Sequence, residues 1–213
     1  MKFRILALLT LTALSACRHA GDVTADNGGG IYSVRSACPI AGVPAGTGDI
    51  TLFNPPSSIE ARAIDVTATI TDVRATCVDS GNDVVSTITF TVVALRRDAG
   101  PARQVLLPYF DVALRGSGMV AAKQVGQVAL NFRDGGLHAW TRAQATVRVN
   151  RGAATLPDNV RRLLTQPRKA GEAEAASDPL ADPAVRSAVA DATFEHLVGF
   201  QMTQDQLKYN ATR

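Results

Sequence analysis

The sequence predicts a mainly β protein, an antiparallel β-sandwich followed by a C-terminal linker and a short helical segment. From Arg62 to Val149 apolar and polar residues alternate with a period of two, which is typical of half-buried strands. Sequences typical of tight turns separate the alternating runs. No helical pattern lies between these runs, and strands joined by short turns pair antiparallel, whereas parallel strands need long crossover connections.

The first two long strands form a predicted hairpin. In the run 64–71, one side is apolar and the other is acidic or threonine: Ile64, Val66, Ala68 and Ile70 against Asp65, Thr67, Thr69 and Thr71. The second strand is Val84–Leu95, with Phe90 among the residues expected to face the core. The segment 79–83, with the sequence Asp-Ser-Gly-Asn-Asp, has the composition of a turn and joins the two strands.

The third predicted strand, Gln104–Leu114, contains Pro108. Because proline has no N–H to donate to a ladder, we expect this strand at a sheet edge or with a bulge. An unpaired edge here could accept a strand from another protein, although proline is also a common device for protecting an edge. The fourth strand, Met119–Phe132, is expected to be irregular at Gly126.

The fifth predicted strand, His138–Val149, has two different sides. Small and apolar residues form one side, and the other carries His138, Trp140, Arg142, Gln144, Thr146 and Arg148. Trp140, Arg142 and Arg148 are a candidate ligand face, because an exposed aromatic ring and guanidinium groups can bind a sugar or an anionic group.

The sandwich domain is predicted to cover residues 31–150. Residues 62–149 span 88 positions, and short strands are also expected at Ile31–Arg35 and Ile50–Phe53. Together they approach the roughly 100 residues of an immunoglobulin-like sandwich. The core tryptophan and the paired strand cysteines of that family are missing, so the prediction is immunoglobulin-like architecture and not family membership.

The composition changes after Asn150. Residues 151–182 are predicted to be a linker with a short helix near Pro157–Leu164, and the part from Gln166 to Asp182 is rich in proline, alanine and glutamate. No internal repeat is visible in the chain.

Residues 183–213 are predicted to be an amphipathic helical segment. Asp182-Pro183 supplies the residue types of an N-cap and a first helical position. Apolar residues between 183 and 200 then fall near one helical face. Thr203 and Gln206 match a capping box for a last short helix. The helix at 183–200 could dock on its own sandwich or on another protein.

The N-terminal residues 1–16 have the pattern of an export signal. Lys2 and Arg4 form a positive end, and Ile5–Ala16 is an uncharged stretch of 12 residues. A helix of that length is too short to span a hydrocarbon core of about 30 Å, but it fits the apolar region of a secretory signal.

The stretch ends in Leu14-Ser15-Ala16-Cys17, which resembles the lipobox of bacterial lipoproteins. The resemblance implies cleavage before Cys17 and lipidation of its sulfur, with residues 17–30 as a flexible tether. Arg18 in place of Asp implies an outer-membrane protein that faces the periplasm. The alternative is an ordinary secretory signal followed by a chance cysteine. Residues 90–132 also resemble uncharacterised bacterial envelope lipoproteins, a likeness that implies no specific role.

The charge balance gives no support for nucleic-acid binding. The whole chain has a formal charge of +3, and removal of residues 1–16 takes away two bases and no acid, which leaves +1. The sequence has no stripe of basic residues interleaved with aromatic ones.

The remaining cysteines, Cys38 and Cys77, are predicted to form a disulfide bond. Cys17 is taken by lipid in the lipoprotein interpretation, and an exported protein folds in an oxidising compartment. The alternatives are two buried thiols or one reactive thiol, but no Cys-X-X-Cys motif is present.

No catalytic or metal-binding set is apparent in the sequence. The histidines are His19 in the tether, His138 at a strand start and His196, which is expected in the C-terminal helix. None belongs to a nucleophile elbow or zinc motif. The acidic turn at 79–83 lacks the remainder of a calcium loop. We therefore predict no enzyme activity, no metal and no cofactor.

These observations predict a non-enzymatic outer-membrane lipoprotein that presents a β-sandwich for contacts with an envelope protein. Its role would be in envelope or secretion-complex assembly. The alternative is a periplasmic module that binds a glycan or peptidoglycan through the candidate ligand face.

Overall fold

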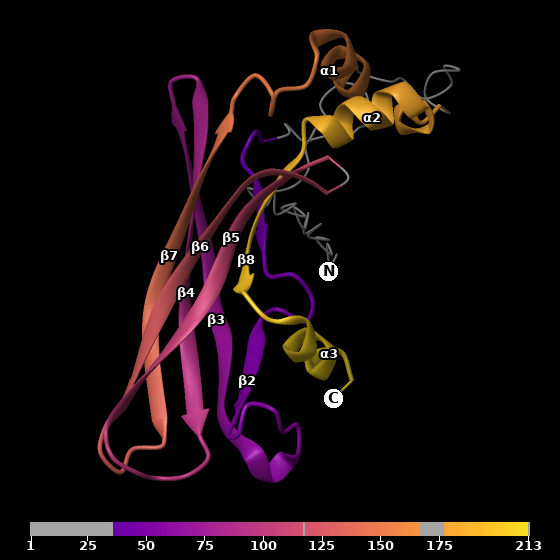
Figure 1. Cartoon of the computed structure of the whole chain (residues 1–213). Helices are drawn as coiled ribbons and strands as arrows, with labels where there is room; N and C mark the ends of the chain where they lie inside the picture. The colour runs from indigo at the N-terminus through magenta and orange to yellow at the C-terminus, as the bar shows by residue number, and fades with distance from the viewer. Residues whose placement is uncertain (1–35, 117, 167–176, 213) are drawn as a thin grey trace, which may run out of the picture.

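The computed structural model describes residues 36–116, 118–166 and 177–212. Figure 1 shows two layers of long strands, with helices beside them. The strands are β1 (Ile40–Gly42), β2 (Asp49–Phe53), β3 (Ile64–Ser80), β4 (Asp83–Arg96), β5 (Arg103–Arg115), β6 (Met119–Phe132), β7 (His138–Asn150) and β8 (Phe194–Phe200). The helices are α1 (Asp158–Thr165), α2 (Pro183–Asp191) and α3 (Gln204–Thr212), with short 3₁₀ turns at Ala61–Ala63 and Pro179–Ala181. The predicted signal, lipobox, tether and strand at 31–35 lie outside the described residues.

The predicted β-sandwich is confirmed. The sheet with the order β1-β8-β5-β6 is called sheet I, and the sheet with the order β2-β3-β4-β7 is called sheet II. The strand pairs are antiparallel except β1 and β8, which run parallel. Chain segments 97–102 and 133–137 connect the two sheets, because β4 and β7 belong to sheet II whereas β5 and β6 belong to sheet I.

Two groups of apolar side chains form the core between the sheets. The larger group includes Phe90, Phe132 and Phe200. The smaller group contains Val84, Ala113, Val147, Val149, Ala154 and Phe194. The alternation seen in the sequence places these side chains inward from both sheets, and burial of their apolar surface is the main stabilising contribution.

Pro108 lies inside sheet I, so the prediction of an edge strand is wrong. β5 pairs with β6 on one side and with β8 on the other. The carbonyl of Pro108 accepts a hydrogen bond from the backbone N–H of Gln201, which means that the proline nitrogen faces β8. β8 ends at Phe200, which pairs with Tyr109. The N–H that proline lacks is therefore at the end of the hydrogen-bond ladder between β5 and β8. Both sides of β5 are occupied, and it cannot accept a strand from another protein.

The bulge between β5 and β6 is at Ala113/Leu114, away from Pro108. The register of these two strands is continuous at Gly126. Gly126 is therefore not the irregular position that we expected. A Cβ atom at Gly126 would lie 2.6 Å from Cζ of Tyr109. The glycine leaves room for that ring, which is a packing requirement and not a break in the ladder.

The predicted helix over 183–200 is a helix only as far as Asp191, and Phe194–Phe200 is the central strand β8. Phe194, His196, Val198 and Phe200 all face the core, with a period of two. The apolar residues of this short run fit the helical period of 3.6 residues as well as the strand period of two. Pairing with β5 and β1 makes the segment a strand.

The helix ends follow the sequence pattern more closely. Asp182 accepts a hydrogen bond from the N–H of Ala184 at 2.8 Å and caps α2. Thr203 and Gln206 form the predicted capping box, since each side chain accepts a hydrogen bond from the other residue's backbone N–H. α3 packs against β2, where the rings of Tyr209 and Phe53 meet edge to face.

The predicted disulfide bond between Cys38 and Cys77 is present, with the two Cα atoms 5.9 Å apart. The two residues are separated by 39 positions. We expect the Cys38→Ser/Cys77→Ser double variant to lose about 2–4 kcal/mol of unfolding free energy, because the bond restricts the unfolded chain. Urea unfolding with and without reductant measures this loss. Reductant should lower the wild-type midpoint and leave the variant unchanged, and equal midpoints for the two oxidised proteins would contradict the prediction.

Candidate functional site

The outward face of sheet II carries an exposed apolar cluster in a threonine-rich surface. Trp140 on β7 is opposite Val93 on β4, and Leu95 lies two residues further along β4. Trp140 is 67 % exposed, and Val93 and Leu95 are also exposed. We call these three residues the Trp140 patch. Their neighbours on β3 are Thr67 and Thr69, so the apolar surface ends abruptly at a polar border.

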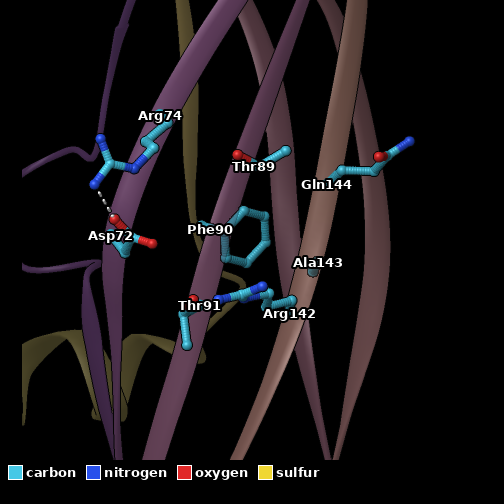
Figure 2. A pocket seen from close by; sticks show the side chains of 8 residues that line it. All are labelled: Asp72, Arg74, Thr89, Phe90, Thr91, Arg142, Ala143 and Gln144. Atoms are coloured by element: carbon cyan, nitrogen blue, oxygen red, sulfur yellow. Dashed lines mark ion pairs between the residues drawn. The ribbon is translucent and has the colours of Figure 1, made fainter.

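A shallow groove of about 570 Å³ lies on the same face, where Thr91 and Arg142 line it two residues along from Val93 and Trp140. Figure 2 shows the side chains of the groove. β3, β4 and β7 each contribute residues to its lining, which are Asp72, Arg74, Thr89, Phe90, Thr91, Arg142, Ala143 and Gln144. The groove occurs where β3 has a register shift between Thr71 and Arg74. Asp72 has a φ of 50° there, in the left-handed region that a non-glycine residue rarely adopts.

The two arginines of the groove have different electrostatic surroundings. Arg74 forms an ion pair with Asp72, with Nη2 and Oδ1 2.8 Å apart (Figure 2). Arg142 lies opposite Thr91 in the register of β4 and β7. No ion pair or hydrogen bond within the described part of the chain uses its guanidinium group. Arg142 is therefore an available cation for a partner, next to the apolar ring of Trp140.

The predicted ligand face is only partly assembled. Trp140 and Arg142 are two residues apart on the outward side of β7 and lie beside the groove. Arg148 is on the same side of β7 but eight residues from Trp140, which is about 27 Å at the rise of a strand. Its register partner is Val85, near the hairpin end of β4. A single small ligand could not contact both Trp140 and Arg148.

A second polar group lies between the two sheets, and the sequence analysis missed it. His196 of β8 makes two hydrogen bonds: Nδ1 lies 2.9 Å from Oγ of Ser86 on β4, and Nε2 lies 2.8 Å from Oδ1 of Asp111 on β5. Ser86 and His196 are fully buried and Asp111 is 4 % exposed. These three residues, which we call the buried triad, separate the larger apolar group of the core from the smaller one.

The buried triad has the residue types of a hydrolase triad but not the access that catalysis requires. A nucleophile has to contact substrate, and Ser86 has no exposed surface. The groove on sheet II is not lined by Ser86, Asp111 or His196, and neither is a second groove beside Leu163 and Pro179. The triad therefore acts as a polar connection between sheets I and II in this conformation.

Tyr109 closes the side of the sandwich next to the buried triad. Its ring packs edge to face on Phe90 of the opposite sheet, and its hydroxyl donates to the carbonyl of Gln144 at 3.3 Å. Burial raises the pKa of the Tyr109 hydroxyl above its usual value of about 10, and the nearby Asp111 carboxylate raises it further.

This pKa shift predicts alkaline destabilisation. Above pH about 10 the unfolded tyrosine loses its proton before the folded one does, so the free energy of unfolding falls as pH rises. Below that pH, Tyr109 contributes no pH dependence. Urea unfolding between pH 8 and 11 should show a shallower alkaline decline for Tyr109→Phe than for the wild type. Equal slopes would contradict the assignment.

Within residues 36–116, 118–166 and 177–212, no three His, Cys, Asp or Glu side chains are grouped so that they could hold a metal ion. The helices in these same ranges include none with the length and apolar character needed to cross a bilayer.

No protein-family model matches the chain, and no curated protein sequence is significantly similar to it. Among solved structures, the chain is similar to a DUF1425 family member from Shewanella sp. pv-4, with 11 % sequence identity and a TM-score of 0.25. The match covers 51 % of this chain and 82 % of the other. A likeness this low carries no conclusion about function.

Proposed function

We propose that this chain is a non-enzymatic bacterial lipoprotein, anchored to the outer membrane by Cys17, that binds an envelope protein through the Trp140 patch and Arg142. The sandwich positions this surface, and the partner belongs to an envelope or secretion complex. The observation that carries the proposal is the exposed apolar patch on the outward face of sheet II, beside the guanidinium group of Arg142, which has no partner among the described residues.

The disulfide bond supports the proposed compartment. Structural disulfides persist in oxidising compartments such as the periplasm and are rare in the cytosol. The bond uses Cys38 and Cys77, so Cys17 is the remaining cysteine of the three in the chain. This is the position at which the resemblance to a lipobox places the lipid.

The residue types of the patch support the proposed contact. Tryptophan and arginine are enriched at the energetically important centres of protein interfaces. Most outward positions around them on β3 and β4 are threonine, such as Thr69, Thr71 and Thr91. An apolar ring in a hydrophilic sheet face is the arrangement expected of a partner-binding surface.

The anchor is tested by mass spectrometry of the N-terminal peptide from the mature protein in its native membrane. The proposal expects a chain that starts at Cys17 and carries acyl groups, and a Cys17→Ser variant that is lost from the membrane fraction. A mature chain with an unmodified Cys17 would overturn the lipoprotein part of the proposal.

The contact is tested by photo-crosslinking in intact cells, with a photoreactive amino acid at position 140 or at position 78. Val78 is exposed and lies at the other end of sheet II, so it is a matched control. We expect a discrete adduct from position 140 that Arg142→Ala weakens, and none from position 78. Equal labelling at the two positions would argue against a specific surface.

The glycan-binding alternative is favoured by the polar groove next to the patch. Trp140 is the one tryptophan of the chain, so its fluorescence reports directly on this surface. A blue shift on titration with soluble peptidoglycan fragments, lost in Arg142→Ala, would replace the protein-contact proposal with this one.

A further inference from the structure

In the part of the chain that the structure describes, the sandwich has four edge strands, and three of them are protected. β1 has three residues. β2 is packed against α3, and the Asn210 side-chain amide donates to the carbonyls of Gly46 and Asp49. β7 carries Arg142 and Arg148, and the hydroxyl of Tyr109 occupies its Gln144 carbonyl. Short length, cover and charge are the usual means by which proteins prevent edge-to-edge pairing.

β6 lacks these protections. It has 14 residues and no proline, and Lys123 is its one charged residue. The ammonium group of Lys123 lies 5.8 Å from the centroid of the Phe110 ring on β5. Its charge therefore lies over sheet I and not at the free edge of β6. Val125 is 59 % exposed, and Val120 and Met119 are similarly exposed. β6 lies next to β7 along one side of the molecule (Figure 1).

The register shows which backbone groups face the free side of β6. Pro108 turns its backbone toward β8, as its bond with Gln201 shows. Its register partner Gln127 therefore turns its N–H and C=O away from β5. Val125 and Ala129, two residues to either side, do the same. No hydrogen bond within the described part of the chain uses these groups on that side.

We propose that β6 is the pairing edge of a homodimer, in which β6 of a second copy adds antiparallel to it and makes sheet I continuous across the two chains. The sequence of β6 is self-complementary in this arrangement. With Val125 opposite Val125 of the second copy, Lys123 lies opposite Gln127, so no like charges face each other. Residues 123–127 then form about six backbone hydrogen bonds between the two copies. This inference does not depend on the Trp140 patch.

Cysteine cross-linking tests the pairing and its register. In the purified protein, each variant carries Cys17→Ser so that the introduced thiol is the free one. Two Val125→Cys residues would have Cα atoms about 5.5 Å apart, within the range for a disulfide. Two Gln124→Cys residues would be more than about 7 Å apart, outside it. Mild oxidation should give a covalent dimer with Val125→Cys at least tenfold faster than with Gln124→Cys.

Sedimentation provides an independent measurement. The wild type should change from monomer to dimer with concentration in the micromolar range, and Val125→Lys should remain monomeric because it places two charges opposite each other. Leu106→Lys is the matched control, since Leu106 is exposed on the interior strand β5 and should leave the dimer intact. A wild type that stays monomeric throughout, or equal cross-linking at positions 124 and 125, would overturn the proposal.

Discussion

Replacing His196 with leucine is expected to lower the free energy of unfolding by about 3–5 kcal/mol, because it leaves two buried polar groups without hydrogen-bond partners, at a cost of about 1–3 kcal/mol or more for each group. The substitution leaves the Asp111 carboxylate and the Ser86 hydroxyl without partners between the two sheets. Both groups are buried, so water cannot replace the lost hydrogen bonds without opening the sandwich. The change in side-chain volume is small, which keeps the loss of packing out of the comparison.

A triple variant separates the polar penalty from a general loss of packing. In Ser86→Ala/Asp111→Val/His196→Leu every member of the buried triad is apolar, and no unpaired polar group remains. Replacing a whole buried polar group by apolar residues is often neutral or stabilising. We therefore expect the triple variant to be more stable than His196→Leu. Urea unfolding followed by far-ultraviolet circular dichroism measures both, and a triple variant less stable than His196→Leu would contradict this interpretation.

The buried triad also shows where sequence reasoning stops. Its hydrogen bonds join residues 110 and 85 positions apart, and no local pattern connects such distant positions. The sequence did contain a weaker indication of the triad, which is a polar residue on the inward side of a strand. Ser86 lies between Val84 and Ile88 on the inward side of β4, so a polar group at that level required a partner in the opposite sheet.

The long hairpins were predictable because alternation specifies both a strand and its buried side. The strand β8 was not, because its apolar residues fit a helical face as well as a strand, and its pairing partners are on β5 and β1. The prediction that the strand of Pro108 lies at a sheet edge was wrong for a related reason. Proline excludes a hydrogen bond on one side of a strand only, and the sequence does not show that β8 ends at that position.

The candidate surface was predictable in part. Trp140 and Arg142 share a side of β7 by simple alternation, and the structure keeps them together. The groove beside them depends on the register shift in β3 at Asp72. That irregularity follows from the pairing of β3 with β4, so the contributions of Arg74 and Thr89 could not be read from the sequence.

Replacing Arg96 with alanine is the second substitution for which we expect a large effect, again about 3–5 kcal/mol of unfolding free energy. Arg96 ends β4 and is 2 % exposed. Its guanidinium group donates to four backbone carbonyls, those of Gly136, Pro101, Gly100 and Arg133, at 2.6–3.1 Å. These carbonyls belong to the segments 97–102 and 133–137, which are two of the connections between sheet I and sheet II, so one side chain holds both segments in place.

The neighbouring Arg97 provides the control, because it is exposed and its guanidinium group donates to one carbonyl, that of Ala61. Arg97→Ala should cost about 1 kcal/mol or less. Arg96→Lys should lose much of what Arg96→Ala loses, since an ammonium group has three donors and lacks the planar fork that reaches all four carbonyls. In urea unfolding the midpoint should fall for both Arg96 variants with an unchanged slope. If Arg96→Ala costs no more than Arg97→Ala, the carbonyl contacts do not hold the two sheets together, and the stability of this end of the sandwich must come from the apolar core around Phe132.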